Sequence, residues 1–324
     1  MKQAFVIGGF LLLCSALAAY TMPYVEQPET VVTDAPAETV EDEAVQALAP
    51  VSPAAEKETQ TYDETVSIKV LLDGAVESMS LNDYVAGVVA AEMPASFEPE
   101  ALKAQAVAAR TNVMRKLAYG SKHGDSDICG ESTCCMGWKQ PESEVFRQAV
   151  EETDGLVVSY DGAIIDAVFF SSSWGNTEDA VEVWGSAVPY LTAVESPEME
   201  IRTETVTIPL TEFCLAVREY SSDADFSGDW LTDVSRTDAG AVKTAVLGGV
   251  ELTGPQIRSL FGLKSACFDM VLTASGVEFT TYGYGHGVGM SQYGANVLAG
   301  EGMDYREILA WYYSGTEVAC PEDY

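Results

Sequence analysis

The most regular pattern of apolar and polar positions in this chain lies between Ser80 and Gly120, and it predicts two helices joined by a sharp break. Ser80 followed by Asp83 is a helix-start signal, because the serine side chain can accept from a free backbone N–H of the first turn. The Met93-Pro94 pair ends this first helix, since a proline disfavours helical geometry in the residue before it.

The second helix is predicted to begin at Pro99, where a missing N–H has no consequence, and to end at Gly120. Its apolar face follows the helical period, at Leu102, Ala106, Ala109, Val113 and Leu117. Arg110 lies on the border of this face, and Glu92 lies at the break between the helices. We therefore expect an acid and a guanidinium group to converge on one cleft.

The remaining pattern predicts short strands and helices in mixed order, so the fold class is α+β, with helices and an antiparallel sheet forming a cleft. Strands are expected at 66–70 and 204–209, and turns or hairpins at Asp73-Gly74, Asp161-Gly162 and Ala239-Gly240. Helices are expected at 146–153, 211–220 and 253–261, and from Asp304 to Gly315. Residues 203–272 are predicted to form a lobe of their own.

Residues 4–22 are apolar and uncharged, and this run is close to the length that crosses a bilayer core as a helix. We favour an uncleaved membrane anchor at 1–22, with the short Lys2 end in the cytoplasm and the rest of the chain outside. A cleaved signal peptide, with Ala16-Leu17-Ala18 as its cleavage site, is the alternative. Lipidation at Cys14 is not expected, because the residue before it is larger than a lipoprotein signal uses.

Residues 23–64 form a predicted linker, in which acidic residues, proline, threonine and alanine surround a single base, Lys57. Such a segment cannot bury enough apolar surface to fold, and charge repulsion keeps it extended as a tether. The folded part, residues 65–324, is expected to start near Val66. The formal charge of −33 over 324 residues argues against nucleic acid as a partner, because phosphates would be repelled.

Four metal-binding side chains lie close together after the second helix, at His123, Cys129, Cys134 and Cys135. They can form a closed tetrahedral zinc site, although their spacing is not that of a standard zinc finger. Disulfide bonding of Cys129 to one of the adjacent cysteines is the alternative, because this side of a membrane is oxidising. The histidine favours structural zinc. The pairing of the other cysteines, Cys214, Cys267 and Cys320, stays open.

Two polar segments carry further candidate residues. The loop 171–177 contains Ser173 and Trp174, and the tryptophan ring either stacks on a sugar or packs the domain. In the second segment, 283–289, glycine occupies every other position, which lets the backbone approach a ligand or another strand closely. His286 lies inside this segment, and Ser291 and Gln292 belong to the first turn of the helix that follows it.

Three stretches together resemble the stage II sporulation protein D family: AAEMPASFEPEALKAQAVAART around Glu92, SSSWGNTEDAVEVWGSAVPYLTAVESP at 171–197, and GYGHGVGMSQYGANVLAGEGMDYREILAWYYSG at 283–315. The resemblance covers roughly residues 66 to 318. It implies a lytic transglycosylase of bacterial peptidoglycan, with Glu92 as the catalytic acid/base. Trp174 departs from the family pattern, which has a glycine there, so this loop must avoid a positive φ at that position.

The same resemblance implies that Ser173, His286, Ser291 and Gln292 line the substrate cleft. It also implies glycan strands without stem peptides as substrate, action in endospore engulfment, and partnership with the amidase stage II sporulation protein P and the membrane scaffold stage II sporulation protein M. The domain would then lie outside the cytoplasmic membrane, in the space between mother cell and forespore, held by a single membrane span.

Glycosidic cleavage normally uses two carboxylates, but a lytic transglycosylase can use one, because the 6-hydroxyl of the muramic acid attacks its own anomeric carbon. Apolar neighbours of Glu92 would help to keep it protonated. We expect Arg110 to contact the lactyl carboxylate of the substrate or to orient the loop. The alternatives are a non-catalytic glycan-binding or scaffold protein, a cysteine amidase with His286 as its base, and a zinc hydrolase.

Overall fold

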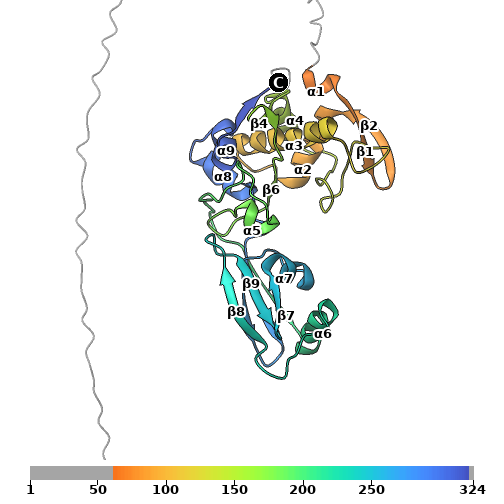
Figure 1. Cartoon of the computed structure of the whole chain (residues 1–324). Coiled ribbons are helices and arrows are strands. Elements are labelled where there is room, and N and C mark those ends of the chain that lie inside the picture. Colours follow the sequence, from red (N-terminus) through yellow and green to blue (C-terminus); the bar gives the residue numbers. More distant parts are fainter. Residues whose placement is uncertain (1–60, 321–324) are drawn as a thin grey trace, which may run out of the picture. The chain divides into compact units, whose positions relative to one another are not determined.

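The computed structural model describes residues 61–320 (Figure 1). Its helices are α1 Tyr62–Thr65, α2 Leu81–Glu92, α3 Pro99–Tyr119, α4 Glu144–Glu151, α5 Ala180–Trp184, α6 Leu210–Tyr220, α7 Gly254–Phe261, α8 Gln292–Gly300 and α9 Tyr305–Tyr312. The predicted anchor 1–22 lies outside the described residues. Within 61–320, none of the helices combines the length and the apolar character that a membrane crossing requires.

The strands form small sheets, and most of the pairings are antiparallel. They are β1 Ser67–Leu72, β2 Ala75–Ser80, β3 Ile128–Cys129, β4 Val157–Tyr160, β5 Ala163–Ile164, β6 Phe169–Phe170, β7 Thr203–Ile208, β8 Leu231–Arg236, β9 Val242–Leu247, β10 Val250–Thr253, β11 Phe268–Leu272, β12 Val277–Tyr282, β13 Met290–Ser291 and β14 Glu317–Ala319. The sheet orders are β2-β1-β3, β10-β9-β8, β11-β12-β7, β13-β6 and β14-β4-β5. The predicted α+β class is confirmed.

Helix α3 is the centre of the main core, and α2, α4, α8 and α9 pack against it (Figure 1). The helix pair has the predicted starts and ends. Ser80 accepts from the N–H of Asp83, Met93 is the C-cap of α2, Pro99 is the first residue of α3, and Gly120 is its C-cap. The predicted apolar face of α3 is buried except for Leu117, which is 37 % exposed. Local sequence signals therefore determine this corner.

The described residues begin with α1, ahead of the start predicted near Val66, so the predicted linker 23–64 is too long at its C-terminal end, and its residues 23–60 lie outside the described part of the chain. Thr61 caps this short helix in a complete capping box with Glu64. Asp63 is buried and pairs with Arg110 of α3. Composition alone assigns this acid to the linker, but its ion pair places it in the core.

The lobe has its own hydrophobic core, built from α6, α7 and the two sheets β10-β9-β8 and β11-β12-β7. Phe213 is at its centre and stacks on Phe261, with ring centroids 5.0 Å apart. Strand β12 pairs with β7 and β11 and contributes the buried Phe279. The lobe therefore extends to Tyr282, ten residues beyond the predicted end at 272, because the middle strand of this sheet follows that point in the sequence.

The glycine-rich segment 283–289 packs against residues 168–174 so closely that a side chain at its glycines would collide with them. A Cβ atom at Gly283 would lie 2.6 Å from the carbonyl oxygen of Ser172, and one at Gly289 would collide with the carbonyl of Val168. Both glycines also have positive φ angles, 71° and 75°. The predicted close approach is confirmed, and the partner is another part of the backbone.

Candidate functional site

Glu92 is the last residue of α2, and two donors from distant parts of the chain hold its carboxylate. The N–H of Gly137 donates to Oε1 at 3.1 Å, and the side-chain amide of Gln292 donates to Oε2 at 3.0 Å. The residue is half-buried. Because each carboxylate oxygen is held separately, the plane of the group is fixed while a lone pair on each oxygen stays available.

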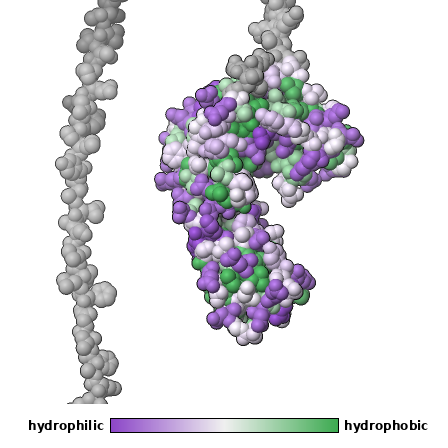
Figure 2. Space-filling model, in the orientation of Figure 1, coloured by the Kyte–Doolittle hydropathy of each residue, from purple (hydrophilic) through white to green (hydrophobic). Residues whose placement is uncertain are grey.

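Glu92 faces a groove of about 1100 Å³ between the main core and the α7 side of the lobe, visible as a hollow in Figure 2. Its lining comes from α2 and α3, from the loop 132–136, from 166–171, from α7 with the turn after it, and from 284–286. Lys264 and Tyr284 also line an adjoining hollow of about 790 Å³. Two hollows that share wall residues provide room for an extended, polar ligand.

His286 lines the groove as predicted, but its ring is not available as a base. One ring nitrogen, Nδ1, accepts from the N–H of Val288 at 3.1 Å, and Nε2 lies 3.1 Å from the carbonyl oxygen of Phe169, which can only accept. Nε2 therefore carries the proton, and the ring is neutral. Burial, together with the positive charge of the neighbouring Arg258, lowers the pKa of His286 to about 4. The cysteine amidase alternative loses its proposed base.

Gln292 also lines the groove, as predicted, and its side-chain amide donates to the Glu92 carboxylate. Ser173 and Ser291 do not line the groove: both are buried and both bind Glu198. Ser173 donates its backbone N–H and Ser291 its hydroxyl, each at 2.7 Å, and burial raises the pKa of Glu198. The prediction that these two serines contact substrate is therefore corrected to a supporting role.

Trp174 packs the domain instead of presenting its face to the groove. It is 9 % exposed, and its Nε1–H donates to the carbonyl of Ala239 at 2.9 Å. The positive φ in this loop is at Gly175, at 110°, and not at Trp174, as the sequence predicted. Of the two roles considered for this ring, the packing role is confirmed.

Arg110 does not reach the groove, so the predicted convergence of Glu92 and Arg110 on one cleft is wrong. Its side chain is 0 % exposed and its Nε donates to Asp63 at 2.6 Å. The remaining guanidinium N–H groups donate to the carbonyl oxygens of Val150 and Leu156 and to the hydroxyl of Thr153. Asp63, which composition placed in the linker, supplies the buried counter-charge that changes the role of this arginine.

Three cations line the groove that sequence reasoning missed: Lys116 of α3, Arg258 of α7, and Lys264 just after α7. The carboxylates of the lining are Glu92 and Asp166, and Asp166 is exposed. Basic residues thus outnumber acidic ones here, although the chain as a whole carries 50 acids and 17 bases. Because the chain has few basic residues, each one could have been considered a candidate for binding an anion. The sequence does not show that these three lie in one groove, because that depends on the tertiary fold.

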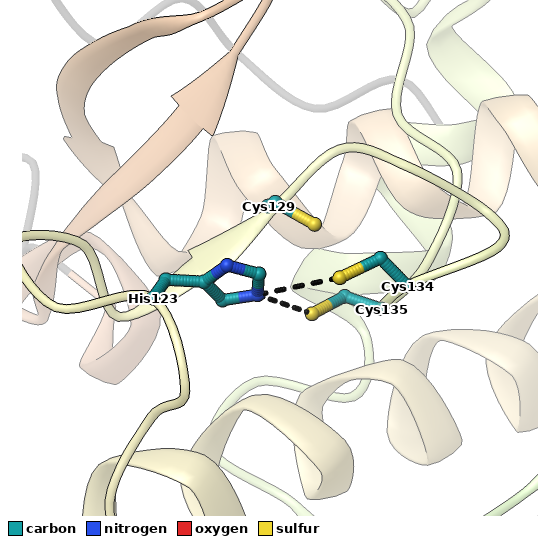
Figure 3. Close-up of side chains that lie close together, drawn as sticks. All are labelled: His123, Cys129, Cys134 and Cys135. Atoms are coloured by element: carbon teal, nitrogen blue, oxygen red, sulfur yellow. Dashed lines mark hydrogen bonds between the residues drawn. The ribbon is translucent and has the colours of Figure 1, made fainter.

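His123, Cys129, Cys134 and Cys135 come together as predicted, with their ligand atoms all within 4.8 Å of one another. Figure 3 shows Nε2 of His123 directed at the sulfur atoms of Cys135, at 3.1 Å, and Cys134, at 3.6 Å. The six cysteines within residues 61–320 are all free, so Cys129 forms no disulfide with either adjacent cysteine, and Cys214, Cys267 and Cys320 are not paired with one another. Cys135 also lines the groove, two positions before the Gly137 donor to Glu92.

Glu178 is a buried acid at the contact between the glycine-rich segment and the lobe. Its N–H donates to the carbonyl of Gly287 at 2.7 Å, and its Oε1 accepts from the Thr237 hydroxyl at 2.9 Å. The N–H of Ala241 also donates to Oε1, at 3.4 Å. Burial, which outweighs these hydrogen bonds, raises the pKa of Glu178 from 4.5 to about 7.

Glu178→Gln is expected to change how stability depends on pH. The folded protein holds the Glu178 proton more tightly than the unfolded chain, so this group's contribution is complete below pH 4.5 and is lost as pH rises through about 7. The loss amounts to roughly 3 kcal/mol. Glutamine keeps the acceptor oxygen and has no proton to lose. Urea unfolding should show the variant gaining stability over wild type between pH 5 and 8; a pH-independent difference would contradict this.

The fold and the site together define an α+β domain in which one hydrogen-bonded carboxylate faces a large polar groove. Residues 73–160 match the family model described as "Stage II sporulation protein". The chain is 38 % identical to stage II sporulation protein D of Bacillus subtilis (strain 168) over 263 residues, and 37 % identical to that of Bacillus amyloliquefaciens over 265 residues; each alignment covers 76 % of both chains. The chain belongs to the stage II sporulation protein D family.

A more distant relative carries a different name. The amidase enhancer of B. subtilis is 29 % identical over 287 residues, an alignment that covers 71 % of this chain and 39 % of that protein.

Proposed function

We propose that this protein is a lytic transglycosylase that cleaves the glycosidic bond between N-acetylmuramic acid and N-acetylglucosamine in peptidoglycan glycan strands. The observation that carries the proposal is the position of Glu92, which two donors hold in place at the wall of a groove with room for a polymer. Family membership supports a role in sporulation. The fixed carboxylate supports the reaction type.

The proposed reaction needs one group that first gives and then takes a proton. Protonated Glu92 donates to the glycosidic oxygen as the bond from that oxygen to the anomeric carbon breaks. The 6-hydroxyl of the same muramic acid then attacks the anomeric carbon, and the Glu92 carboxylate accepts the hydroxyl proton. The products are a 1,6-anhydro end and a free hydroxyl, and no water is consumed. Gly137 and Gln292 keep the carboxyl group in one orientation through both steps.

Purified protein incubated with glycan strands stripped of stem peptides tests this proposal. Mass spectrometry of the soluble products should show fragments that end in 1,6-anhydro-muramic acid. Fragments that end in an ordinary reducing sugar would indicate hydrolysis. Tight binding of the strands without any cleavage would favour the non-catalytic scaffold instead.

We also propose that His123, Cys129, Cys134 and Cys135 hold a structural Zn²⁺. The donor set fits, because Zn–S bonds of about 2.3 Å place tetrahedral ligand atoms a little under 4 Å apart, close to the observed spacing. Four protein ligands leave no open position for water, so the metal would fix the loop that carries Gly137 and take no part in the chemistry.

Loss of this metal is expected to lower both stability and turnover, because the loop would no longer hold the Gly137 donor against Glu92. Metal analysis should find about one Zn²⁺ per chain. The double variant Cys134→Ser/Cys135→Ser should lose the metal and melt at a lower temperature, whereas Cys214→Ser, outside the cluster, should retain it. A metal-free protein whose melting temperature is unchanged by chelators would contradict the proposal.

The setting follows from the family and remains part of the proposal. We propose that residues 1–22 anchor the domain to the cell membrane and that it acts outside the cytoplasm during engulfment. Stage II sporulation proteins P and M are the proposed partners. The similarity to a protein named amidase enhancer supports a functional link to an amidase, which would supply strands freed of stem peptides.

A further inference from the structure

We propose, as an extension of the function proposed above, that Arg258 binds a carboxylate group of the substrate in the groove. Arg258 lies in the last turn of α7, on the lobe side, and lines the groove together with His286 and Tyr284. It is half-buried. This position gives the groove a fixed positive charge on the wall that the lobe contributes.

The guanidinium group of Arg258 is held in place but is not neutralised. Its Nε donates to the carbonyl of Leu263 at 3.3 Å, which fixes the side chain across the turn that ends α7. Among the described residues, its terminal NH₂ groups have no carboxylate partner. Two adjacent N–H donors in one plane match the two oxygens of a carboxylate.

Arg115 and Arg258 are half-buried and have no ion pair among the described residues, and of the two only Arg258 lines the groove. Acids outnumber bases 50 to 17, and the arginines at 110, 147 and 236 each pair with an aspartate. Partial burial without a counter-charge is unfavourable, and it lowers the pKa of Arg258. A bound carboxylate would remove that penalty. The other lobe cation of the groove, Lys264, already lies 3.9 Å from Glu204 and over the ring of Tyr284.

Glycan strands can supply the carboxylate from two sources. The lactyl group of muramic acid carries a free carboxylate in strands without stem peptides, and in strands with stem peptides it is an amide. Stem peptides carry carboxylates of their own. The shared chemistry is a carboxylate that recurs along the strand at each muramic acid, so binding through Arg258 would set the register of the strand relative to Glu92.

The test compares Arg258→Gln with wild type on three substrates: stripped strands, the same strands after their lactyl carboxylates have been converted to amides, and strands with stem peptides. Arg218→Gln is the matched control, because Arg218 is an exposed arginine of the same lobe and does not line the groove. Binding of each substrate and the KM and kcat of turnover are measured for each protein.

On the substrate that supplies the carboxylate, Arg258→Gln should weaken binding and raise KM by about tenfold to a hundredfold, with a smaller change in kcat. Arg258→Lys should restore part of the loss, and Arg218→Gln should match wild type. If the lactyl group is the source, amidation should weaken wild-type binding by a similar factor and leave Arg258→Gln unaffected. If stem peptides are the source, the variant's defect should appear on the strands that carry them.

Equal effects of Arg258→Gln on all three substrates, or none, would overturn the proposal. A structural defect is recognised separately, because it would lower the melting temperature and would not depend on the substrate. The binding measurements can be made whether or not the protein cleaves the strands. Carboxylate-dependent binding without anhydro products would leave the role of Arg258 intact and refute the transglycosylase, whereas anhydro products without carboxylate dependence would do the reverse.

Discussion

Glu92→Gln is expected to reduce the formation of anhydro-ended products from stripped glycan strands by about 10³-fold or more, because the proposed reaction uses this one group both as acid and as base. Glutamine has nearly the same shape, so the corner between α2 and α3 should fold as before. Its amide can still accept from the N–H of Gly137, and the amide of Gln292 can rotate to offer its oxygen to the new NH₂ group. Melting temperature and strand binding should change little.

Two matched variants sharpen this test. Glu98 is an exposed glutamate six residues further on whose side chain makes no capping hydrogen bond, so Glu98→Gln should leave turnover unchanged. Asp166 is the other carboxylate in the lining of the groove, and Asp166→Asn should still give anhydro products. Loss of activity in both Glu92→Gln and Asp166→Asn would favour a two-carboxylate hydrolase. Undiminished turnover by Glu92→Gln would refute the assignment.

Asp63→Ala is expected to destabilise the fold by about 3–5 kcal/mol, since it leaves the Arg110 guanidinium buried without a counter-charge. The side chains of both partners are essentially inaccessible to water, at 1 % and 0 % exposure. Urea unfolding monitored by circular dichroism measures the loss. The double variant Asp63→Ala/Arg110→Met should recover part of it, because no buried charge then remains.

The surface pair of Arg147 and Asp83 provides the control. Its side chains are 32 % and 53 % exposed, so Arg147→Gln should change the unfolding free energy by about 1 kcal/mol or less. A loss of similar size in Asp63→Ala and Arg147→Gln would mean that the buried pair does not hold α1 against α3.

The elements that local signals determine were predictable from the sequence. The Ser80 and Asp304 caps, the Met93-Pro94 break and the Asp161-Gly162 turn act within a few residues of themselves, and all occur as expected. The last helix is the partial exception, because it ends at Tyr312 and not at Gly315. The lobe was also placed correctly except for its last strand.

The candidate site was predictable only in part, because its contacts join residues far apart in the sequence. The family motifs predicted that Glu92, Gln292 and His286 belong to one cleft. In the structure Gln292 binds Glu92, 200 positions away, and His286 lines the groove. Helical periodicity puts Arg110 near the cleft, but it gives no information on Asp63, 47 positions earlier, which binds it elsewhere. The Gly137 donor is a backbone N–H, so no side-chain pattern marks it.

The most direct measurement of the central claim is the fate of solvent oxygen during cleavage. Stripped strands are digested by the purified protein in water enriched in the heavy oxygen isotope, and the new chain ends are analysed by mass spectrometry. The proposed reaction predicts anhydro ends that contain no heavy oxygen, because the 6-hydroxyl of the muramic acid forms the new bond. Incorporation of heavy oxygen at the new ends during cleavage would show that water is the nucleophile and would contradict the account.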